Sequence, residues 1–133
     1  GRDCLIDRTS WLVNGENIEL GDHVKVATYT ALIAGFQSKI QIGNYALIGP
    51  GVIVVAANHG IAMTGVPMRD QSWTEGTVVI GEDAWLGANS VILPGSTIGN
   101  GAIVGAGTVV HGHIPPNTIV HQDMGALVMR PRR

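Results

Sequence analysis

The side chain in this sequence best suited to move a proton near neutral pH is histidine, whose unperturbed pKa is about 6.5. His59 follows Asn58 at the point where a regular apolar pattern gives way to a polar segment containing Gly and Pro. A histidine beside such a segment could face a cleft and act as a general base. The alternative is a hydrogen-bonded histidine at a turn. The position of His59 alone leaves both roles open.

Other reactive side chains are less well placed. Cys4 is the only cysteine, so the chain forms no internal disulfide, and it lies far from His59 in the repeat described below. A Cys–His nucleophile is therefore not expected. Asp70 and Glu75 could orient His59 or bind hydroxyl groups, although loop carboxylates of this kind are usually solvated.

A six-residue repeat must position these side chains. Stepping by six gives an apolar residue at fourteen of fifteen positions in two frames. In the second frame a small residue follows four positions later, and glycine often comes directly after the apolar residue. An amphipathic helix would need the spacing i, i+3, i+4 and i+7, which no long segment shows. The first frame is Ile6, Leu12, Ile18, Val24, Thr30, Phe36, Ile42, Ile48 and Val54; the second is Ile80, Leu86, Ile92, Ile98, Val104 and Val110, with small residues Ala84, Ser90, Ser96, Ala102 and Thr108.

A large inward residue, a small inward residue and a glycine-containing turn, repeated every six residues, predict a prism-like coil of short strands. Three faces of six residues make an 18-residue triangular coil, so residues 6–59 correspond to three coils and residues 80–115 to two more. The two frames lie 26 residues apart, two more than a multiple of six. We therefore expect an all-β parallel solenoid, one domain over residues 1–133, with a loop extruded at about residues 60–77.

The composition excludes several classes of protein. Hydrophobic residues make up 45% of the chain and charged residues 14%, which is unlike a disordered protein, and the 19 glycines lack the period of three found in collagen. A net charge of −2 argues against nucleic-acid binding. The longest apolar stretch, residues 47–57, is far shorter than the roughly 20 residues that span a bilayer, and no signal peptide is visible. We expect a cytoplasmic protein without membrane insertion.

Three motifs stand out beyond the repeat itself. Asn58-His59 precedes the loop, the run Val78 to Gly95 contains Ile-Gly-x-x-x-Trp-x-Gly, and Ile114-Pro115-Pro116-Asn117 follows near the end. Together they resemble the hexapeptide-repeat acyltransferases, most closely the sugar O-acetyltransferase branch that includes galactoside, maltose and polysaccharide acetyltransferases. The resemblance implies a left-handed parallel β-helix. It also implies acetyl transfer from acetyl-coenzyme A to a hydroxyl of a sugar or glycan, and a homotrimer with active sites between subunits.

The resemblance further implies roles for individual residues, with His59 as the base. The chain departs from the family at His111-Gly112-His113 and at Leu127, where basic residues usually meet the phosphates of coenzyme A. Arg130 and its neighbours could take their place. The residues implied for acetyl-coenzyme A are Trp85, Gly87, Ala88, Gly105, Ala106, His111, Gly112 and Arg130, and those implied for the acceptor are Tyr29, Asn58, Met68 and Gln71.

Two alternatives stay open at this stage. One is an N-acyltransferase that acts on an amino sugar, a nucleotide sugar or a drug. The other is a non-catalytic or zinc-dependent β-helix protein. Related β-helix carbonic anhydrases hold zinc with a His-x-x-x-x-His pair and a third histidine, a spacing that His111, His113 and His121 do not provide. We therefore expect no metal.

Overall fold

The computed structural model describes residues 1–123 of the chain. Within this range the chain forms short β-strands and two single-turn 3₁₀ helices, η1 (Gly15–Asn17) and η2 (Met68–Asp70). The strands are β1 (Leu5–Ile6), β2 (Trp11–Val13), β3 (Ile18–Leu20), β4 (Lys25–Val26), β5 (Ala31–Ile33), β6 (Ile40–Ile42), β7 (Leu47–Ile48), β8 (Ile53–Val55), β9 (Ala57–His59), β10 (Trp73–Glu75), β11 (Val78–Ile80), β12 (Trp85–Leu86), β13 (Val91–Ile92), β14 (Thr97–Ile98), β15 (Ile103–Val104), β16 (Val109–Val110), β17 (His113–Ile114) and β18 (Ile119–Val120).

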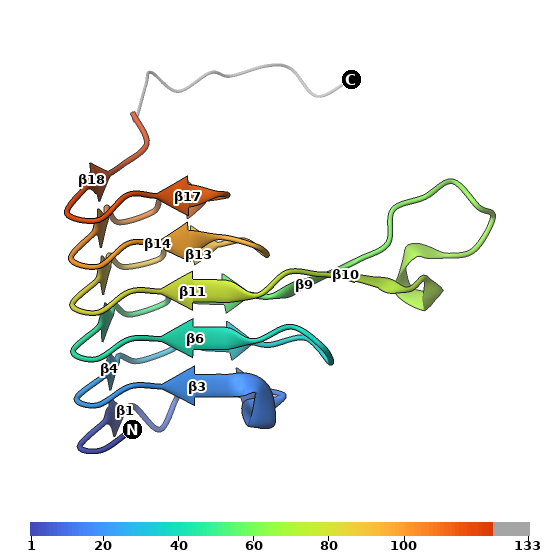
Figure 1. Cartoon of the computed structure of the whole chain (residues 1–133). Coiled ribbons are helices and arrows are strands. Elements are labelled where there is room, and N and C mark those ends of the chain that lie inside the picture. Colours follow the sequence, from blue (N-terminus) through green and yellow to red (C-terminus); the bar gives the residue numbers. More distant parts are fainter. Residues whose placement is uncertain (124–133) are drawn as a thin grey trace.

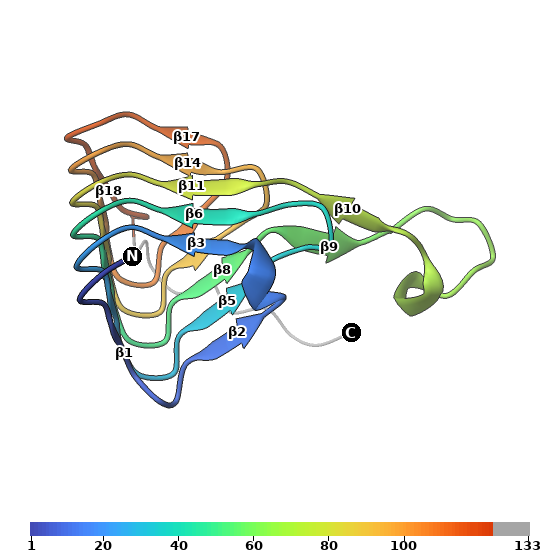
Figure 2. The ribbon, with the colours of Figure 1, turned by 60° about the horizontal axis from the view of Figure 1, so that its bottom comes forward.

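Most of these strands stack into three parallel sheets, which form the sides of a triangular prism (Figures 1 and 2). The strand orders are β1-β4-β7-β12-β15-β18, β2-β5-β8-β13-β16 and β3-β6-β11-β14-β17. We call these the first, second and third sheets. Because each sheet takes one strand from each turn of the chain, the chain visits the three sheets in rotation. The prediction of an all-β parallel solenoid is confirmed.

The core runs along the prism axis and is built as the six-residue pattern predicts. In strands β12 to β16 a large residue such as Leu86, Ile92 or Val104 points inward and is buried. The residue two positions earlier is also buried, and in these coils it is small. All five predicted small residues behave in this way: Ala84, Ser90, Ser96, Ala102 and Thr108.

The prediction of three regular 18-residue coils over residues 6–59 is wrong. Successive coils are 18 residues apart where Ile80 pairs with Ile98, but Ile6 pairs with Val26 and Val26 with Ile48, which are separations of 20 and 22 residues. Two segments are inserted: η1, and residues 34–39 between β5 and β6. Phe36, predicted to be in the core, lies in the second insertion and is 69% exposed.

The six-residue frame concealed these insertions for a numerical reason. The step between paired core positions is eight residues from Leu12 to Leu20 and ten from Leu32 to Ile42, in place of six. The excesses of two and four residues sum to six, so the original frame resumes at Ile42. Between the insertions the frame falls on residues that also point inward, two positions before the large ones.

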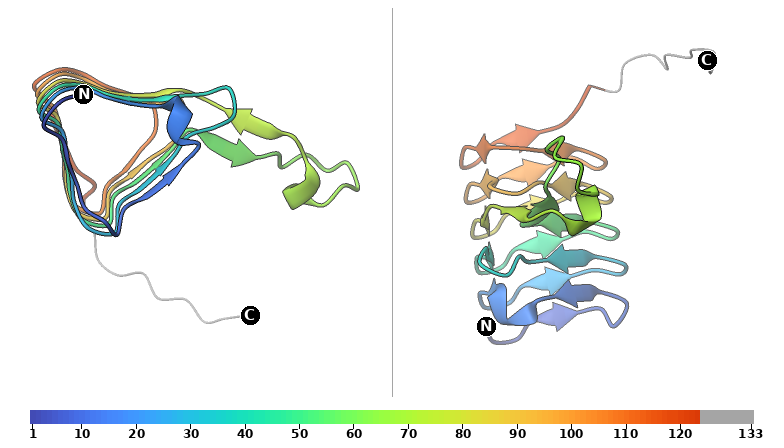
Figure 3. Two further views of the ribbon diagram at one scale, coloured as in Figure 1. Left: turned by 90° about the horizontal axis from the view of Figure 1, so that it is seen from below. Right: turned by 90° about the vertical axis from the view of Figure 1, so that its right-hand side faces the viewer.

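The insertions all leave the prism at one corner, as the view along the axis shows (Figure 3). This insertion corner joins the second sheet to the third and comprises residues 14–17, 34–39 and 56–77. In its third turn the chain runs out along β9, forms a loop over residues 60–72 and returns along β10, which pairs antiparallel with β9. The loop predicted at about residues 60–77 is therefore a β-ribbon carrying a loop.

The other two corners are tight turns. The glycine corner joins the first sheet to the second and comprises residues 27–30, 49–52, 87–90 and 105–108. The asparagine corner joins the third sheet to the first, and there the Oδ1 atoms of Asn44 and Asn100 accept hydrogen bonds from the backbone N–H groups of Asp22 and Glu82 in the preceding coil. In the described part of the chain, no helix is long and apolar enough to cross a membrane.

At the asparagine corner, we expect the stability of the fold to depend strongly on Gly43. A Cβ atom added to Gly43 would lie 2.6 Å from the backbone nitrogen of Glu82 in the next coil, so stacked backbones would have to separate. We expect Gly43→Ala to lower the free energy of unfolding by about 1–3 kcal/mol, measured by chemical denaturation at fixed protomer concentration. Gly15→Ala is the control, because an added Cβ there meets nothing within 4 Å. Equal stability of the two variants would contradict this account of coil stacking.

Candidate active site

His59 lies on the ribbon at the insertion corner, directly opposite Trp73. The two residues are register partners in the β9–β10 pair, so their side chains project from the same side of the ribbon. The ring centroids are 5.3 Å apart with an interplanar angle of 64°, an edge-to-face contact. Trp73 is 39% exposed, and His59 is also exposed. A solvent-accessible imidazole is thus held against an aromatic ring.

The two rings form one end of a small pocket. Its other walls come from Ile33 and Val55 of the second sheet and from Ala57 and Asn58 of β9. The pocket is mainly apolar, with His59 and Asn58 as its polar groups. A concave apolar site with few polar groups is the usual form of a small-molecule site, and this one contains the predicted base.

A second aromatic ring supports Trp73 from the neighbouring coil. Phe36, in the inserted segment, lies 5.2 Å from Trp73 between ring centroids at an angle of 46°. Neither Trp73 nor Phe36 was predicted to be part of the site. Phe36 falls on the six-residue frame, which predicts a core position, and none of the sequence motifs includes Trp73.

Glu75 has a structural role that the sequence did not reveal. Its carboxylate accepts hydrogen bonds from three successive backbone N–H groups, those of Phe36 (3.2 Å), Gln37 (2.8 Å) and Ser38 (2.7 Å). The hydrogen bond from Gln37 is the main cause that lowers the pKa of Glu75 below its ordinary value. The expectation that Glu75 is a solvated loop charge is therefore wrong, since backbone N–H groups hold its carboxylate. Asp70, by contrast, is exposed and pairs with Arg69 at 3.4 Å.

The loop beyond the ribbon is held together by Gln71. Its Oε1 accepts from the backbone N–H of Ala62, and its Nε2 donates to the carbonyl oxygens of Ala62 and Val66. Because these bonds occupy the amide, Gln71 shapes the loop in this structure. Met68, in η2, is 61% exposed and remains free to contact a ligand.

The residues implied for acetyl-coenzyme A do not all lie near His59. Gly87, Ala88, Gly105 and Ala106 lie at the glycine corner, on the far side of the second sheet from the insertion corner. Trp85 precedes them on β12 of the first sheet, and its side chain is 49% exposed. The glycines also have a packing role, since a Cβ on Gly87 would lie 2.6 Å from the backbone nitrogen of Ala106.

The remaining predicted residues that the structure describes lie at both of these corners. Tyr29 is at the glycine corner, two coils before Gly87, and is exposed. His111 and Gly112 lie between β16 and β17, two coils beyond the ribbon on the insertion-corner edge. Gly112 has φ +104°, which disfavours any side chain there. Arg130 lies outside the described residues. Within one chain the predicted site is therefore divided between two corners.

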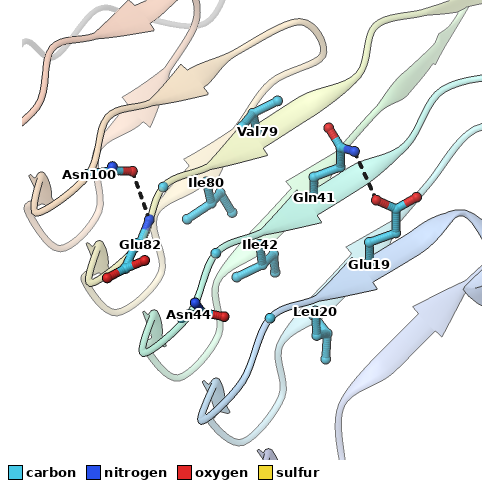
Figure 4. A pocket seen from close by; sticks show the side chains of 12 residues that line it. Glu19, Leu20, Gln41, Ile42, Asn44, Val79, Ile80, Glu82 and Asn100 are labelled. Atoms are coloured by element: carbon cyan, nitrogen blue, oxygen red, sulfur yellow. Dashed lines mark hydrogen bonds between the residues drawn. The ribbon is translucent and has the colours of Figure 1, made fainter. Parts of the chain in front are cut away.

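A wider, shallow groove follows the third sheet and contains none of the predicted residues (Figure 4). It runs past Glu19, Gln41, Asn44, Glu82 and Asn100. Glu19 accepts hydrogen bonds from Gln41 and Lys39, which hold the pKa of its carboxyl below the ordinary value, Lys39 being the main cause. No histidine lines this groove, so it does not contain the predicted base.

Comparison with known proteins identifies the repeat. Residues 77–112 match the family described as bacterial transferase hexapeptide (six repeats). The chain is 34% identical over 112 residues to a putative lipopolysaccharide biosynthesis O-acetyl transferase, WbbJ, of Escherichia coli, covering 79% of this chain and 53% of the relative. The chain belongs to the hexapeptide-repeat transferase family.

A second relative is similar over most of the chain. Galactoside O-acetyltransferase of Lactococcus lactis is 29% identical over 120 residues, covering 90% of this chain and 56% of that protein. The chain thus spans about half the length of the curated relatives it matches.

A hexapeptide-repeat-containing acetyltransferase of Vibrio cholerae, solved with acetyl-coenzyme A, superposes with a TM-score of 0.82 at 29% identity, covering 93% of this chain and 66% of that one. The predicted left-handed parallel β-helix is confirmed. In residues 1–123 no three His, Cys, Asp or Glu side chains come together as a metal site requires.

The hydrogen bonds to Glu75 predict how stability responds to pH. Its folded-state pKa lies below the ordinary 4.5, so the carboxylate contributes stability above that pH and loses the contribution as the pH falls through the folded value. We expect the difference in unfolding free energy between wild type and Glu75→Gln to be largest near neutral pH and to shrink in acid. Denaturant titrations at several pH values measure it. A difference that is constant with pH would contradict the ionised, hydrogen-bonded carboxylate.

Proposed function

We propose that this protein moves an acetyl group from acetyl-coenzyme A to a hydroxyl group of a sugar or glycan in the cytoplasm. The observation that carries the proposal is His59, exposed at the end of an apolar pocket and packed against Trp73. The sugar acetyltransferases among the relatives, and the acetyl-coenzyme A complex of the Vibrio cholerae protein, support the choice of donor and acceptor.

In the proposed mechanism both substrates are bound before any bond is broken. The acceptor hydroxyl attacks the thioester carbonyl carbon while His59 takes its proton, so a C–O bond forms and the carbonyl oxygen becomes an oxyanion. Backbone N–H groups stabilise this oxyanion. The C–S bond then breaks, and the proton passes from the imidazolium to the leaving thiolate. The products are the acetyl ester and coenzyme A.

The donor would be held at the glycine corner. Gly87, Ala88, Gly105 and Ala106 carry little or no side chain, so a pantetheine arm could approach the backbone amide and carbonyl groups closely. Trp85 lies beside this corner with about half of its surface exposed and offers an aromatic face. We assign His111 and Gly112, and Arg130 beyond the described residues, to the phosphate end of the donor.

The acceptor would enter at the insertion corner. Asn58 lines the pocket beside His59, and Met68 is exposed on the loop. We propose that both contact the acceptor, that Gln71 acts by shaping the loop, and that Tyr29 contacts the acceptor from a neighbouring subunit.

An amino group in place of the hydroxyl would give N-acylation by the same proton transfer. Thiol release from acetyl-coenzyme A across a panel of sugars and amino sugars tests both, and no release with any acceptor would overturn the proposal.

The outer surfaces of the prism favour a trimer. At the paired strand positions, the outward-facing residues of the second sheet are all apolar, and most of those of the first sheet are apolar too. The outward-facing residues of the third sheet are mainly polar. Two apolar faces that share the glycine corner suit a threefold ring in which the first sheet of one subunit packs on the second sheet of the next. The residues are Leu5, Lys25, Leu47, Trp85, Ile103 and Ile119 on the first sheet, Trp11, Ala31, Ile53, Val91 and Val109 on the second, and Glu19, Gln41, Val79, Thr97 and His113 on the third.

This packing would complete the active site. The His59 pocket includes Ile33 and Val55 at the edge of the second sheet. In the proposed ring this edge faces the neighbour's first sheet, which carries Trp85 next to Gly87. Donor residues of one subunit and the base of another would then line one cleft, which accounts for their separation within a single chain.

His59→Ala is expected to lower turnover about 10²–10⁴-fold, the usual contribution of a positioned general base. The fold should be unchanged, because the imidazole is exposed. His23→Ala is the matched control: His23 is an exposed histidine at the asparagine corner, where it stacks on Tyr45. Steady-state kinetics with a saturating acceptor measures the effect. Unchanged turnover in His59→Ala would remove His59 from the mechanism.

Subunit mixing tests the shared site. His59→Ala removes the base, and Ala106→Arg blocks the donor groove at an exposed position that already carries a Cβ. Each variant alone should be inactive. After they are unfolded and refolded together in equal amounts, three-quarters of the trimers contain both kinds of subunit, and each has one intact site in three. Activity should therefore recover to roughly a quarter of wild type.

No recovery, despite mixed trimers demonstrated by mass spectrometry, would place the whole site in one chain. A monomer in sedimentation at micromolar concentration would also overturn the trimer.

A further inference from the structure

We infer that Glu75 is a positioning residue for the acceptor half of the active site. Its carboxylate ties the inserted segment of one coil to the ribbon of the next and so fixes Trp73 against His59. The kinetic part of this inference rests on the proposed acetyl transfer, whereas the structural part does not.

Glu75 ends strand β10 and is half-buried, and its carboxylate is bound by backbone groups alone. The N–H groups of Phe36, Gln37 and Ser38 converge on its two oxygens, so the turn forms an anion-binding nest filled by the protein's own side chain. In residues 1–123 no lysine or arginine pairs with this carboxylate. The contact is therefore specific to the backbone shape of residues 36–38, and it joins segments 37–39 positions apart in the chain.

Gly35 shows how closely the turn is fitted to this carboxylate. A Cβ atom on Gly35 would overlap both the Glu75 carboxylate and the Ser38 hydroxyl. Gly35 is buried, so the side chain would have no free space to enter. The absence of a side chain at position 35 is thus a requirement of the Glu75 contact.

The contact reaches His59 through two aromatic rings. On the ribbon, the Glu75–Ala57 pair lies two residues from the Trp73–His59 pair and on the same side. At the other end of the Glu75 contact, Phe36 of the inserted segment packs on Trp73. Trp73 is thus fixed from behind by Phe36 and along its strand by Glu75, and its edge contact limits the orientations of the His59 ring.

Loss of the carboxylate would free the segment that carries Phe36. Trp73 would then lose its support, and the His59 ring would sample more orientations. This change affects the step in which the acceptor hydroxyl approaches the imidazole. It does not affect the donor residues at the glycine corner, which lie across the second sheet. The Michaelis constant for the acceptor and the turnover should change, and the Michaelis constant for acetyl-coenzyme A should not.

The test uses two variants that break the same contact from opposite sides. Glu75→Gln removes the charge and one acceptor oxygen, and Gly35→Ala displaces the carboxylate while leaving it charged. Glu82→Gln is the matched control, the same chemical change at an exposed position on the asparagine corner. Phe36→Leu keeps the three hydrogen bonds and removes only the aromatic support, so the inference stays testable if the first two variants unfold.

The first readout is independent of catalysis. The ring protons of His59, assigned by their loss in His59→Ala, feel the ring current of Trp73 in NMR spectra. We expect these resonances to move toward free histidine in Glu75→Gln, Gly35→Ala and Phe36→Leu, and to stay in place in Glu82→Gln. Unmoved resonances in all three folded variants would overturn the positioning role.

The second readout is kinetic. We expect about a tenfold or larger loss in kcat/KM for the acceptor in the three variants, with the Michaelis constant for acetyl-coenzyme A unchanged. An equal change for both substrates, or none, would overturn the assignment to the acceptor half. If the wild-type protein transfers no acetyl group but the His59 resonances still move, the proposed function fails and the structural role of Glu75 stands.

Discussion

Every strand within residues 1–123 is two or three residues long, and none could bury its inward side chains alone. The controlling constraint is therefore the stacking of coils: each large inward residue rests on the equivalent residue of the coils before and after it. Leu86, for example, is fully buried between Ile48 and Val104. Such a column tolerates no extra residue within a side of the prism, because the extra residue would turn every following side chain to the other face. Additional chain can leave only at the corners.

The location of the candidate active site follows from that constraint. Three coils in succession insert residues at the same corner, so segments distant in sequence lie next to one another there. Phe36 from one coil reaches Trp73 from the next, and the Glu75 carboxylate closes the remaining gap. The rigid prism fixes where each insertion begins and ends, and contacts among the insertions set the geometry around His59. The part of the insertion that extends away from the prism as a loop is thus confined to residues 60–72, beyond the aromatic rings.

How much of this was predictable depends on the range of the interaction. The core residues, the loop and His59 follow from a local pattern, since each hexapeptide repeats the same packing problem. Phe36 was misassigned because the insertions of two and four residues sum to one repeat, and a periodic test cannot detect a shift by its own period. The role of Glu75 depends on backbone N–H groups 37–39 positions earlier, which no spacing rule connects to it. The aromatic support of Trp73 was missed for the same reason.

The regularity that builds the core also determines the outer surface. Because coils stack in register, outward residues form ladders, and a whole side of the prism becomes either apolar or polar. The polar third sheet has a wide groove without a histidine in its lining, while His59, the proposed base, lies beside the apolar second sheet. An apolar side beside a half-formed pocket is poorly suited to water, and a second copy of the chain would cover it with the first sheet and Trp85. Assembly and catalysis would then depend on the same ladders, since the surface that excludes water from the interface also supplies the missing wall of the site.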